Sequence, residues 1–258
     1  MFAFLKKKSE PPVAEQPTVV YNFNNIGAIA QFFKAETGIT FEKQESILNN
    51  KVTTFCKQRM IHSYEALLEV IQTDSSLKQE LIDYLTTNET YFYREFKQIE
   101  ALVGLVKANK GNVNILCAPC ATGEEPYSIV IALLEAGVAP YSFSIVAIDI
   151  NADAIVQAQT ARYKQRNVRN LSDDMLKKYF IKDEEHYLLH DHIKAMVRFE
   201  CMNIFDDALQ SLGTFEYIFS RNMLIYFDKE TKLKAKSILE NLRTNPKQEV
   251  FFGHADLF

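Results

Sequence analysis

The sequence predicts an α/β protein with a doubly wound, Rossmann-like sheet, a small all-α N-terminal domain and a small antiparallel β insert. From residue 96 onward, short apolar runs alternate with amphipathic helical stretches, as is typical of βαβ units. Residues 24–85 instead repeat apolar side chains at helical spacing, with no strand-like alternation. The expected parts are a flexible tail (1–20), a helical domain (21–95) and an α/β domain (96–258) with the insert at about 180–200.

The N-terminal part begins with a stretch that has three prolines, three consecutive lysines and no periodic apolar face, so we expect it to be flexible. Gly27 and Gly38 interrupt the helical pattern of this domain. Ser76 and Gln79 have the spacing of a capping box for its last helix. The apolar positions of the expected helices are Ile26, Ile29 and Phe33, then Ile47, Leu48, Val52 and Phe55, then Leu67, Leu68 and Ile71, then Leu77, Leu81 and Leu85.

The α/β part follows a helix expected near 96–107. Gly137 is placed to end a helix, and Asn151 and Asp228 are placed to cap two others. The alternation predicts a mostly parallel sheet. Strands are expected near 113–118, 143–148, 197–199, 215–220 and 250–252, helices near 124–136, 152–161 and 229–242, and short insert strands at 187–189 and 195–199.

Composition limits the classes of partner, the compartment and the kinds of site that this chain can have. A formal net charge of −4 over 258 residues gives no general basic field, which argues against a nucleic-acid backbone as the main partner. The longest apolar runs are far shorter than the roughly 18 to 20 residues of a membrane-spanning helix. Cys56, Cys117, Cys120 and Cys201 are too scattered for a disulfide framework, so we expect a cytoplasmic protein. No second CxxC accompanies Cys117 and Cys120 to complete a zinc site.

A turn follows the first expected strand and opens a helix, with the sequence Cys-Ala-Pro-Cys-Ala-Thr-Gly-Glu-Glu-Pro-Tyr-Ser over residues 117–128. In α/β sheets, ligands bind at this carboxyl end, where glycine lets the backbone approach closely. Glu124 and Glu125 occupy the first helical turn, where they disfavour a phosphate-rich ligand and favour a positively charged one. S-adenosylmethionine has this character, since it has no phosphate and carries a sulfonium and an amino group.

The second strand ends at Asp149, which lies 149 − 123 = 26 positions after Gly123. An acid about 20 residues past the glycine turn accepts hydrogen bonds from ribose hydroxyls in dinucleotide folds. Asp149 is therefore the ribose candidate, with a helix cap or a solvated strand end as the alternative. A lone glycine turn without GxGxxG leaves the ligand open.

Five motifs in order resemble those of the CheR chemotaxis receptor methyltransferases. They are Thr-Asn-Glu-Thr-Tyr-Phe-Tyr-Arg-Glu (87–95), Ala-Thr-Gly-Glu-Glu-Pro-Tyr-Ser (121–128), Asp149, Met-Asn-Ile (202–204) and Ser-Arg-Asn-Met-Leu-Ile-Tyr-Phe-Asp (220–228). The resemblance covers roughly residues 24–254, with Gly253 and His254 matching the last strand of the family.

The resemblance implies a protein-glutamate O-methyltransferase that uses S-adenosylmethionine, yields S-adenosylhomocysteine, and esterifies glutamates on the cytoplasmic helices of chemoreceptors, the methyl-accepting chemotaxis proteins. The helical domain would dock this substrate, and residues 96–258 would be the methyltransferase domain. Catalytic positions implied by the resemblance are Arg94 and Tyr226. Cofactor contacts implied by it are Asn88, Thr90, Arg94, Glu125, Asp149, Asn203, Ile204, Arg221 and Asn222.

The chemistry agrees with these positions. A glutamate carboxylate, with a pKa of about 4.3, is ionised at neutral pH and needs no general base. The enzyme must therefore align the carboxylate oxygen with the sulfonium methyl and remove part of the water around the carboxylate. Arg94 would steer the substrate carboxylate or hold the cofactor, and Tyr226 would orient through its hydroxyl and ring edge. Taken singly, Arg94 could be a surface helix residue and Tyr226 a packing residue.

Other readings of the sequence remain open. Methyl transfer to a nucleic acid or small molecule on the same fold is one, although the segment at 220–223 lacks the Pro-Pro-aromatic motif of base methyltransferases. A catalytically silent adaptor that binds S-adenosylmethionine or its product is another. His186, His190 and His192 lie near acidic residues, but the sequence has no HExxH on a helix, so we expect no metal site and a solvated hairpin.

Two surface features bear on partners. The segment 180–199 is short and has no glycine, unlike the peptide-gripping insert of many relatives. Basic residues of the helical domain could present a positive face to acidic receptor helices, or could be solvated. They are Lys34, Lys43, Lys51, Lys57 and Arg59.

Overall fold

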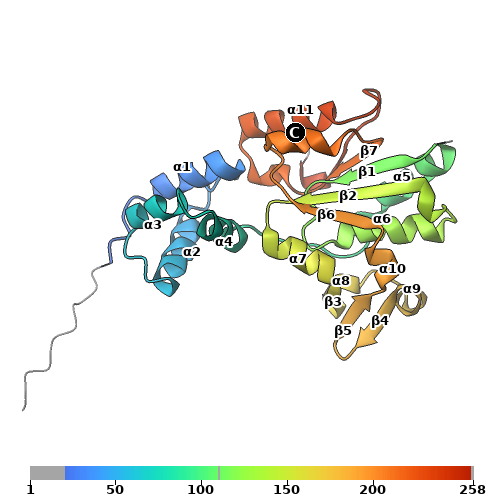
Figure 1. Cartoon of the computed structure of the whole chain (residues 1–258), viewed down its shortest axis with the longest axis horizontal. Helices are drawn as coiled ribbons and strands as arrows, with labels where there is room; N and C mark the ends of the chain where they lie inside the picture. The colour runs from blue at the N-terminus through green and yellow to red at the C-terminus, as the bar shows by residue number, and fades with distance from the viewer. Residues whose placement is uncertain (1–20, 110, 257–258) are drawn as a thin grey trace, which may run out of the picture.

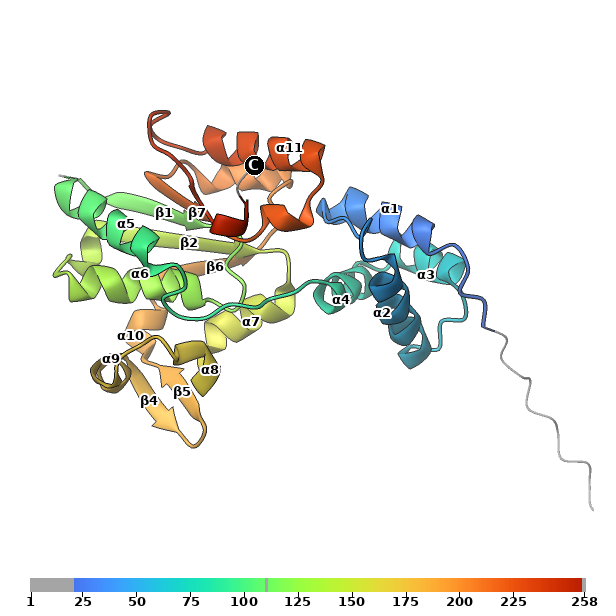
Figure 2. The ribbon, with the colours of Figure 1, turned by 180° about the vertical axis from the view of Figure 1, so that it is seen from behind.

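The computed structural model describes residues 21–109 and 111–256, so the expected flexible tail lies outside the described residues. A helical unit and an α/β unit lie side by side, and an extended segment after α4 runs between them to α5 (Figures 1 and 2). The α/β class, the small helical unit and the small antiparallel sheet that the sequence predicts are all present. None of the helices in the described ranges is both long and apolar enough to cross a lipid bilayer.

The helical unit has the four-part pattern that the apolar spacing predicts. Ile29, Phe33, Val52 and Leu67 are among the side chains that form its separate apolar core. The spacing works because residues three and four apart share one face of a helix. Its helices are α1 (Ile26–Thr37), α2 (Glu45–Gln58), α3 (Tyr64–Ile71) and α4 (Ser75–Leu85).

The expected capping box of α4 is wrong. Asp74, not Ser76, caps this helix, because its Oδ1 accepts hydrogen bonds from the backbone N–H groups of Ser76 and Leu77, both at 3.0 Å. The carboxylate is also the better acceptor for the free N–H groups at a helix start. Ser76 therefore lies inside the first turn.

A parallel sheet forms the centre of the α/β unit, with the order β6-β2-β1-β7-β8. Every neighbouring pair is parallel. Apolar residues flank both faces of the strands, which explains their nearly continuous apolar runs. The strands are β1 (Val113–Cys117), β2 (Phe143–Asp149), β6 (Val197–Cys201), β7 (Tyr217–Ser220) and β8 (Phe251–Phe252).

Helices cover both faces of the sheet, as a doubly wound fold requires. On β1, Ile115 and Cys117 face the core shared with α5, α6 and α7, whereas Leu116 between them faces the core shared with α11 (Figure 1). The expected caps are confirmed, since Asn151 accepts from Ala154 N–H at 2.7 Å and Asp228 from Thr231 N–H at 2.8 Å. The covering helices are α5 (Phe96–Ala108), α6 (Glu124–Glu135), α7 (Ala152–Thr160) and α11 (Lys229–Asn241).

The small antiparallel sheet has the order β3-β5-β4, and one of its expected strands is wrong. Residues 195–199 do not join it, because Val197–Cys201 is β6, the edge strand of the main sheet. Glu184 takes a left-handed φ of 53° in the turn between β4 and β5, where hairpins usually place glycine. The strands are β3 (Arg162–Lys164), β4 (Phe180–Asp183) and β5 (His186–Leu189), with helices α8 (Gln165–Val168), α9 (Asp173–Tyr179) and α10 (Asp191–Lys194) beside them.

Short 3-10 turns complete the fold, and two of them lie near the carboxyl ends of β7 and β8. These turns are η1 (Pro140–Ser142), η2 (Asp207–Leu212), η3 (Leu224–Tyr226) and η4 (His254–Asp256).

The two units are joined by specific polar contacts. Backbone N–H of Thr40 donates to Tyr226 O at 2.9 Å, and Asp83 accepts from the N–H of Ala152, the first residue of α7, at 2.7 Å. These contacts hold the helical unit against the carboxyl ends of the main strands.

Candidate active site

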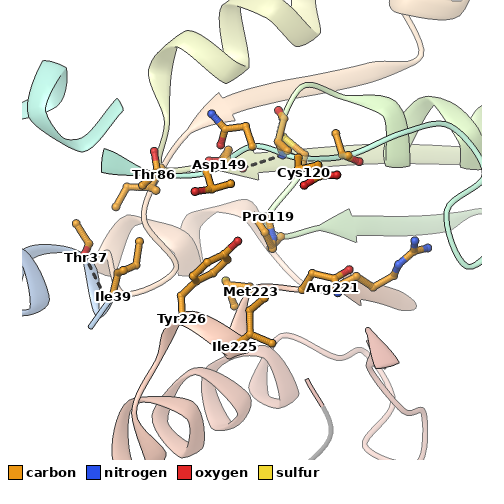
Figure 3. Close-up of a pocket in the computed structure, with 18 of the residues that line it drawn as sticks. Thr37, Ile39, Thr86, Pro119, Cys120, Asp149, Arg221, Met223, Ile225 and Tyr226 are labelled. Carbon is orange, nitrogen blue, oxygen red and sulfur yellow. Dashed lines mark hydrogen bonds between the residues drawn. The ribbon is translucent and has the colours of Figure 1, made fainter. Parts of the chain in front are cut away.

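A cavity of about 790 Å³ lies at the carboxyl ends of β1, β2, β6 and β7, where the helical unit meets the sheet (Figure 3). Its wall also includes the linker after α4 and the start of α2. All ten site residues that the sequence and the resemblance indicate line it, although they come from five separate segments. These residues are Asn88, Thr90, Arg94, Glu125, Asp149, Asn203, Ile204, Arg221, Asn222 and Tyr226.

The turn after β1 brings backbone close to the cavity. Gly123 has a left-handed φ of 90°, and a Cβ placed on it would lie 2.9 Å from Cβ of Ala158 in α7. Glycine is thus required both by the backbone conformation and by the close packing of α7. The turn is held to β2 by the bond from Cys120 N–H to Ile148 O, 2.8 Å long.

Asp149 lies at the end of β2 with only 6% of its surface exposed, so it is not a solvated strand end. Its carboxylate accepts from Ala121 N–H at 2.7 Å and from Asn151 N–H at 2.9 Å. Nor does it cap α7, because Asn151 does. Burial raises its pKa, and the hydrogen bonds from backbone N–H groups oppose that rise.

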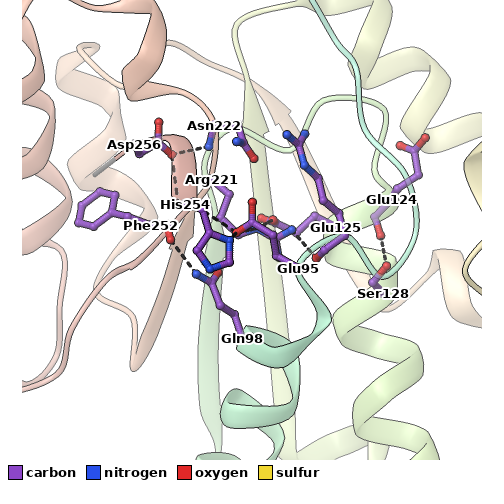
Figure 4. Close-up of polar contacts among 12 residues, drawn as sticks. Glu95, Gln98, Glu124, Glu125, Ser128, Arg221, Asn222, Phe252, His254 and Asp256 are labelled. Atoms are coloured by element: carbon purple, nitrogen blue, oxygen red, sulfur yellow. Dashed lines mark hydrogen bonds and ion pairs between the residues drawn. The ribbon is translucent and has the colours of Figure 1, made fainter. Parts of the chain in front are cut away.

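A buried charge cluster lies beside the turn (Figure 4). Nε of Arg221 is 3.0 Å from Oε2 of Glu125, and both side chains are largely buried. Burial raises the pKa of Glu125, and the guanidinium of Arg221 opposes this shift. Glu95 lies further away, with its carboxylate 4.0 Å from the same Nε.

Three buried polar atoms around this cluster have no hydrogen-bond partner within the part of the chain that the structure describes. They are Oε1 of Glu125, Nη1 of Arg221 and Oδ1 of Asn222, apart from Nε of Arg221, which has only its ion pair with Glu125. Buried polar atoms are rarely left unpaired, and these supply two acceptors and one cationic donor at one cavity wall. An α-amino group and an α-carboxylate need such partners, so the residues fit the amino-acid end of S-adenosylmethionine.

Glu124 does not share the role of its neighbour. It is fully buried, accepts from Thr122 Oγ1 at 2.6 Å and from Asn167 Nδ2 at 2.7 Å, and is not part of the cavity wall. Consecutive helical residues point about 100° apart, so only one of two adjacent acids can face the ligand. The sequence motif could not separate them, although helix geometry already implies that their roles differ.

Arg94 and Tyr226 come from segments far apart in the sequence but line the same cavity. Arg94 Nη1 donates to Glu89 O at 3.1 Å, and its guanidinium is 5.8 Å from the ring centroid of Tyr91. Tyr226 is 37% exposed, and burial of its other part raises the pKa of its phenol, so the hydroxyl is protonated at neutral pH. Both side chains can therefore donate hydrogen bonds to an anionic substrate.

Asn203 lines the cavity with its side chain already engaged. Its Nδ2 donates to Glu36 O at 2.8 Å, and its Oδ1 accepts from Phe205 N–H at 3.1 Å. The amide thereby ties the loop after β6 to the end of α1. The adjacent Ile204 is buried and offers an apolar surface.

Sequence reasoning missed several residues of the wall and its support. Arg169, Tyr91 and Lys51 line the cavity, and Asp256 bonds the loop that carries Asn222. No short motif marks Arg169 or Lys51, because the fold alone brings them to the rim. Asp256 lies outside the five motifs, so no pattern in the sequence marks it.

The histidines do not converge on a metal site in the described residues. His190 and His192 stack with ring centroids 5.6 Å apart. No group of three or more His, Cys, Asp or Glu side chains in residues 21–109 and 111–256 is placed to hold a metal ion.

Comparison with known proteins adds to this geometry. A family model for the CheR methyltransferase, SAM binding domain, matches residues 88–258, which include all ten site residues. The chain is 35% identical over 222 residues to a chemotaxis protein methyltransferase of Campylobacter jejuni serotype O:23/36, covering 86% of this chain and 84% of that protein. It is 35% identical over 240 residues to chemotaxis protein methyltransferase 2 of Vibrio cholerae, covering 87% and 82%. The solved magnesium protoporphyrin IX methyltransferase from Synechocystis PCC 6803 matches with 14% identity and a TM-score of 0.33, covering 70% and 67%.

Proposed function

The chain belongs to the CheR methyltransferase family, and from this premise we propose that it esterifies glutamate side chains of chemoreceptors with methyl groups from S-adenosylmethionine. The observation that carries the proposal is the convergence of ten residues, from five segments far apart in the sequence, on one cavity. The products are a glutamyl methyl ester and S-adenosylhomocysteine.

Cofactor binding is assigned to the inner wall. When bound, S-adenosylmethionine supplies a methyl group on a positively charged sulfur. Glu125, Arg221 and Asn222 have the unpaired groups that suit the amino-acid end. Asp149 holds an ionisable carboxylate at the end of β2, suited to ribose hydroxyls. Asn88, Thr90, Asn203 and Ile204 complete the binding wall.

Arg94 and Tyr226 are assigned to the substrate side. The target carboxylate is ionised at neutral pH, so no side chain needs to remove a proton from it. The guanidinium orients this carboxylate by charge-assisted hydrogen bonding, and the phenol by its hydroxyl. The wall between the helical unit and the sheet reduces the access of water to the carboxylate.

Substrate docking is assigned to the helical domain, residues 21–95, with residues 96–258 as the methyltransferase domain. The basic face is smaller than the sequence suggested, because Lys34 pairs with Asp228 at 2.5 Å and Arg59 with Glu80 at 2.8 Å. The other three predicted basic residues have no ion pair with the described residues and stay available to acidic receptor helices. They are Lys43, Lys51 and Lys57. Since those receptor helices are cytoplasmic, the proposal places the enzyme in the cytoplasm.

The test is transfer of a radiolabelled methyl group from S-adenosylmethionine to receptor-containing membranes, followed by mild alkali. Label released as volatile methanol supports carboxyl methylation. Alkali-stable label would indicate another acceptor chemistry and overturn the proposal. Measurable cofactor binding with no label on receptors of the same organism would favour a silent adaptor. Asp149→Ala serves as the control, because it should lose label through weaker cofactor binding.

A further inference from the structure

The turn that follows β8 contains a buried carboxylate that the proposed chemistry does not use. Asp256 has no exposed surface, and its carboxylate accepts hydrogen bonds from three backbone N–H groups (Figure 4). The donors are Asn222, Ile225 at 3.2 Å and Gly253 at 3.2 Å. Two of these donors lie in the loop that leads from Asn222 to Tyr226. The carboxylate therefore fixes the backbone of that loop at two points.

The same turn also holds the segment that carries Arg94. Backbone N–H of His254 lies 3.3 Å from Oε2 of Glu95, and its ring Nδ1 lies 3.2 Å from that oxygen. Gln98 Nε2 donates to Phe252 O at 2.7 Å, one turn further along α5. Residues 252–256 thus bond the segment after Arg94 on one side and the segment before Tyr226 on the other.

Asn222 needs this support. Its φ is 60°, a left-handed conformation that costs energy for a residue other than glycine and persists only where surrounding contacts impose it. Asp256 binds its N–H, and its Oδ1 is one of the unpaired acceptors at the cavity wall. A Cβ on Gly253 would lie 2.9 Å from Asn222 N and 3.0 Å from Oδ2 of Asp256. The glycine is therefore required by the close approach of the two segments.

We propose that Asp256 is a positioning residue and that the turn 253–256 is a bracket that sets the placement of Asn222 and Tyr226 relative to Arg94. It touches neither cofactor nor substrate. It acts by holding two backbone segments whose side chains face one cavity. A shift of a few tenths of an ångström in that loop moves the Asn222 amide away from its ligand and the Tyr226 hydroxyl away from the substrate carboxylate.

Asp256→Asn tests the bracket with little change of volume. It replaces one carboxylate oxygen by an amide NH2 group, which cannot accept a hydrogen bond from a backbone N–H. We expect the Kd for S-adenosylhomocysteine to rise by about tenfold and kcat to fall by about 100-fold, with KM for the receptor changed less than about twofold. Asp74→Asn is the matched control. It makes the same change at a carboxylate that also accepts backbone N–H groups but caps α4 outside the cavity wall, so ligand affinity and kcat should stay within about twofold.

Gly253→Ala tests the same idea without changing any charge, and it decides the matter if Asp256→Asn does not fold. Its Cβ displaces Asn222 directly, so affinity and kcat should fall as in Asp256→Asn. If both variants lower the melting temperature but keep affinity and kcat within about twofold of wild type, the turn is only structural and the inference is wrong. The kcat readout rests on the proposed function, whereas affinity for S-adenosylhomocysteine, measured by calorimetry, does not. Failure of the wild-type protein to methylate receptors would therefore count against the proposed function alone.

Discussion

Replacement of Gly123 by alanine should damage both stability and cofactor binding, and the structure separates the two causes of the stability loss. The left-handed φ of 90° costs a non-glycine residue about 1–2 kcal/mol. The new Cβ would also lie 2.9 Å from Cβ of Ala158 and 3.2 Å from the ring of Tyr127, and overpacking of this kind costs about 1–3 kcal/mol. The expected total loss in the free energy of unfolding is about 2–5 kcal/mol.

Gly137→Ala is the matched control for this experiment. Gly137 also has a left-handed φ, 76°, but a Cβ on it would meet nothing within 4 Å, so only the conformational cost of about 1–2 kcal/mol applies. Denaturant unfolding measures the two losses, and calorimetry with S-adenosylhomocysteine measures affinity. Affinity should fall only in Gly123→Ala, because its turn carries Ala121 and Glu125 into the cavity wall. Equal stability losses and unchanged affinity in both variants would refute the packing argument.

Three further predictions concern the cavity and the contact between the two units. Asp149→Ala should weaken S-adenosylhomocysteine binding by about tenfold or more in calorimetry, because a buried acceptor is lost. Tyr226→Phe should bind this ligand nearly normally and lower kcat. Equal binding losses in the two variants would contradict these separate roles. Arg169→Ala should raise KM for the receptor by about threefold in the methyl-transfer assay, because its guanidinium stacks on Tyr91 at the cavity rim and has no ion pair in the described residues. Arg166 lies outside the cavity, so Arg166→Ala should leave KM unchanged. Equal KM values in the two variants would exclude a substrate contact of Arg169. The hydrogen bond from Lys34 lowers the pKa of Asp228 from 3.8 to about 2. The charged carboxylate therefore stabilises the fold fully above pH 3.8, and this contribution is lost as the pH falls towards 2. The difference in unfolding free energy between wild type and Asp228→Asn should shrink over that interval, and a difference independent of pH would rule out this ionisation.

The bracket and the contacts between the two units both hold the loop that carries Tyr226. Tyr226 is held from one side by its backbone bond to Thr40 in the helical unit and from the other by the bonds of Asp256 to its loop. Gly38 permits the first contact, because a Cβ on it would lie 2.4 Å from the ring of Phe205. The helical unit is therefore part of the cavity wall, in addition to its proposed docking role.

Periodicity and caps determined most of the fold. Helical spacing in residues 24–85 predicted the four helices of the first unit, and alternation after residue 96 predicted the parallel sheet with helices on both faces. Asn151, Gly137 and Asp228 marked helix ends correctly, because capping is a local interaction that needs only a few neighbouring residues. The motifs that carry the family resemblance contain ten residues that the structure brings to one cavity wall. Those that follow β1, β2, β6 and β7 meet there because the carboxyl ends of parallel strands share one edge.

The tertiary structure alone decided which polar groups are engaged and which are free. Residue type could not separate Glu124, which is bonded to Thr122 and Asn167, from Glu125, which faces the cavity. It also could not predict that Lys34 is paired with Asp228 or that Asp256 supports Asn222. These contacts join residues far apart in the chain. Their formation depends on how the two units and the sheet edges pack, and a local sequence pattern carries no information about that packing.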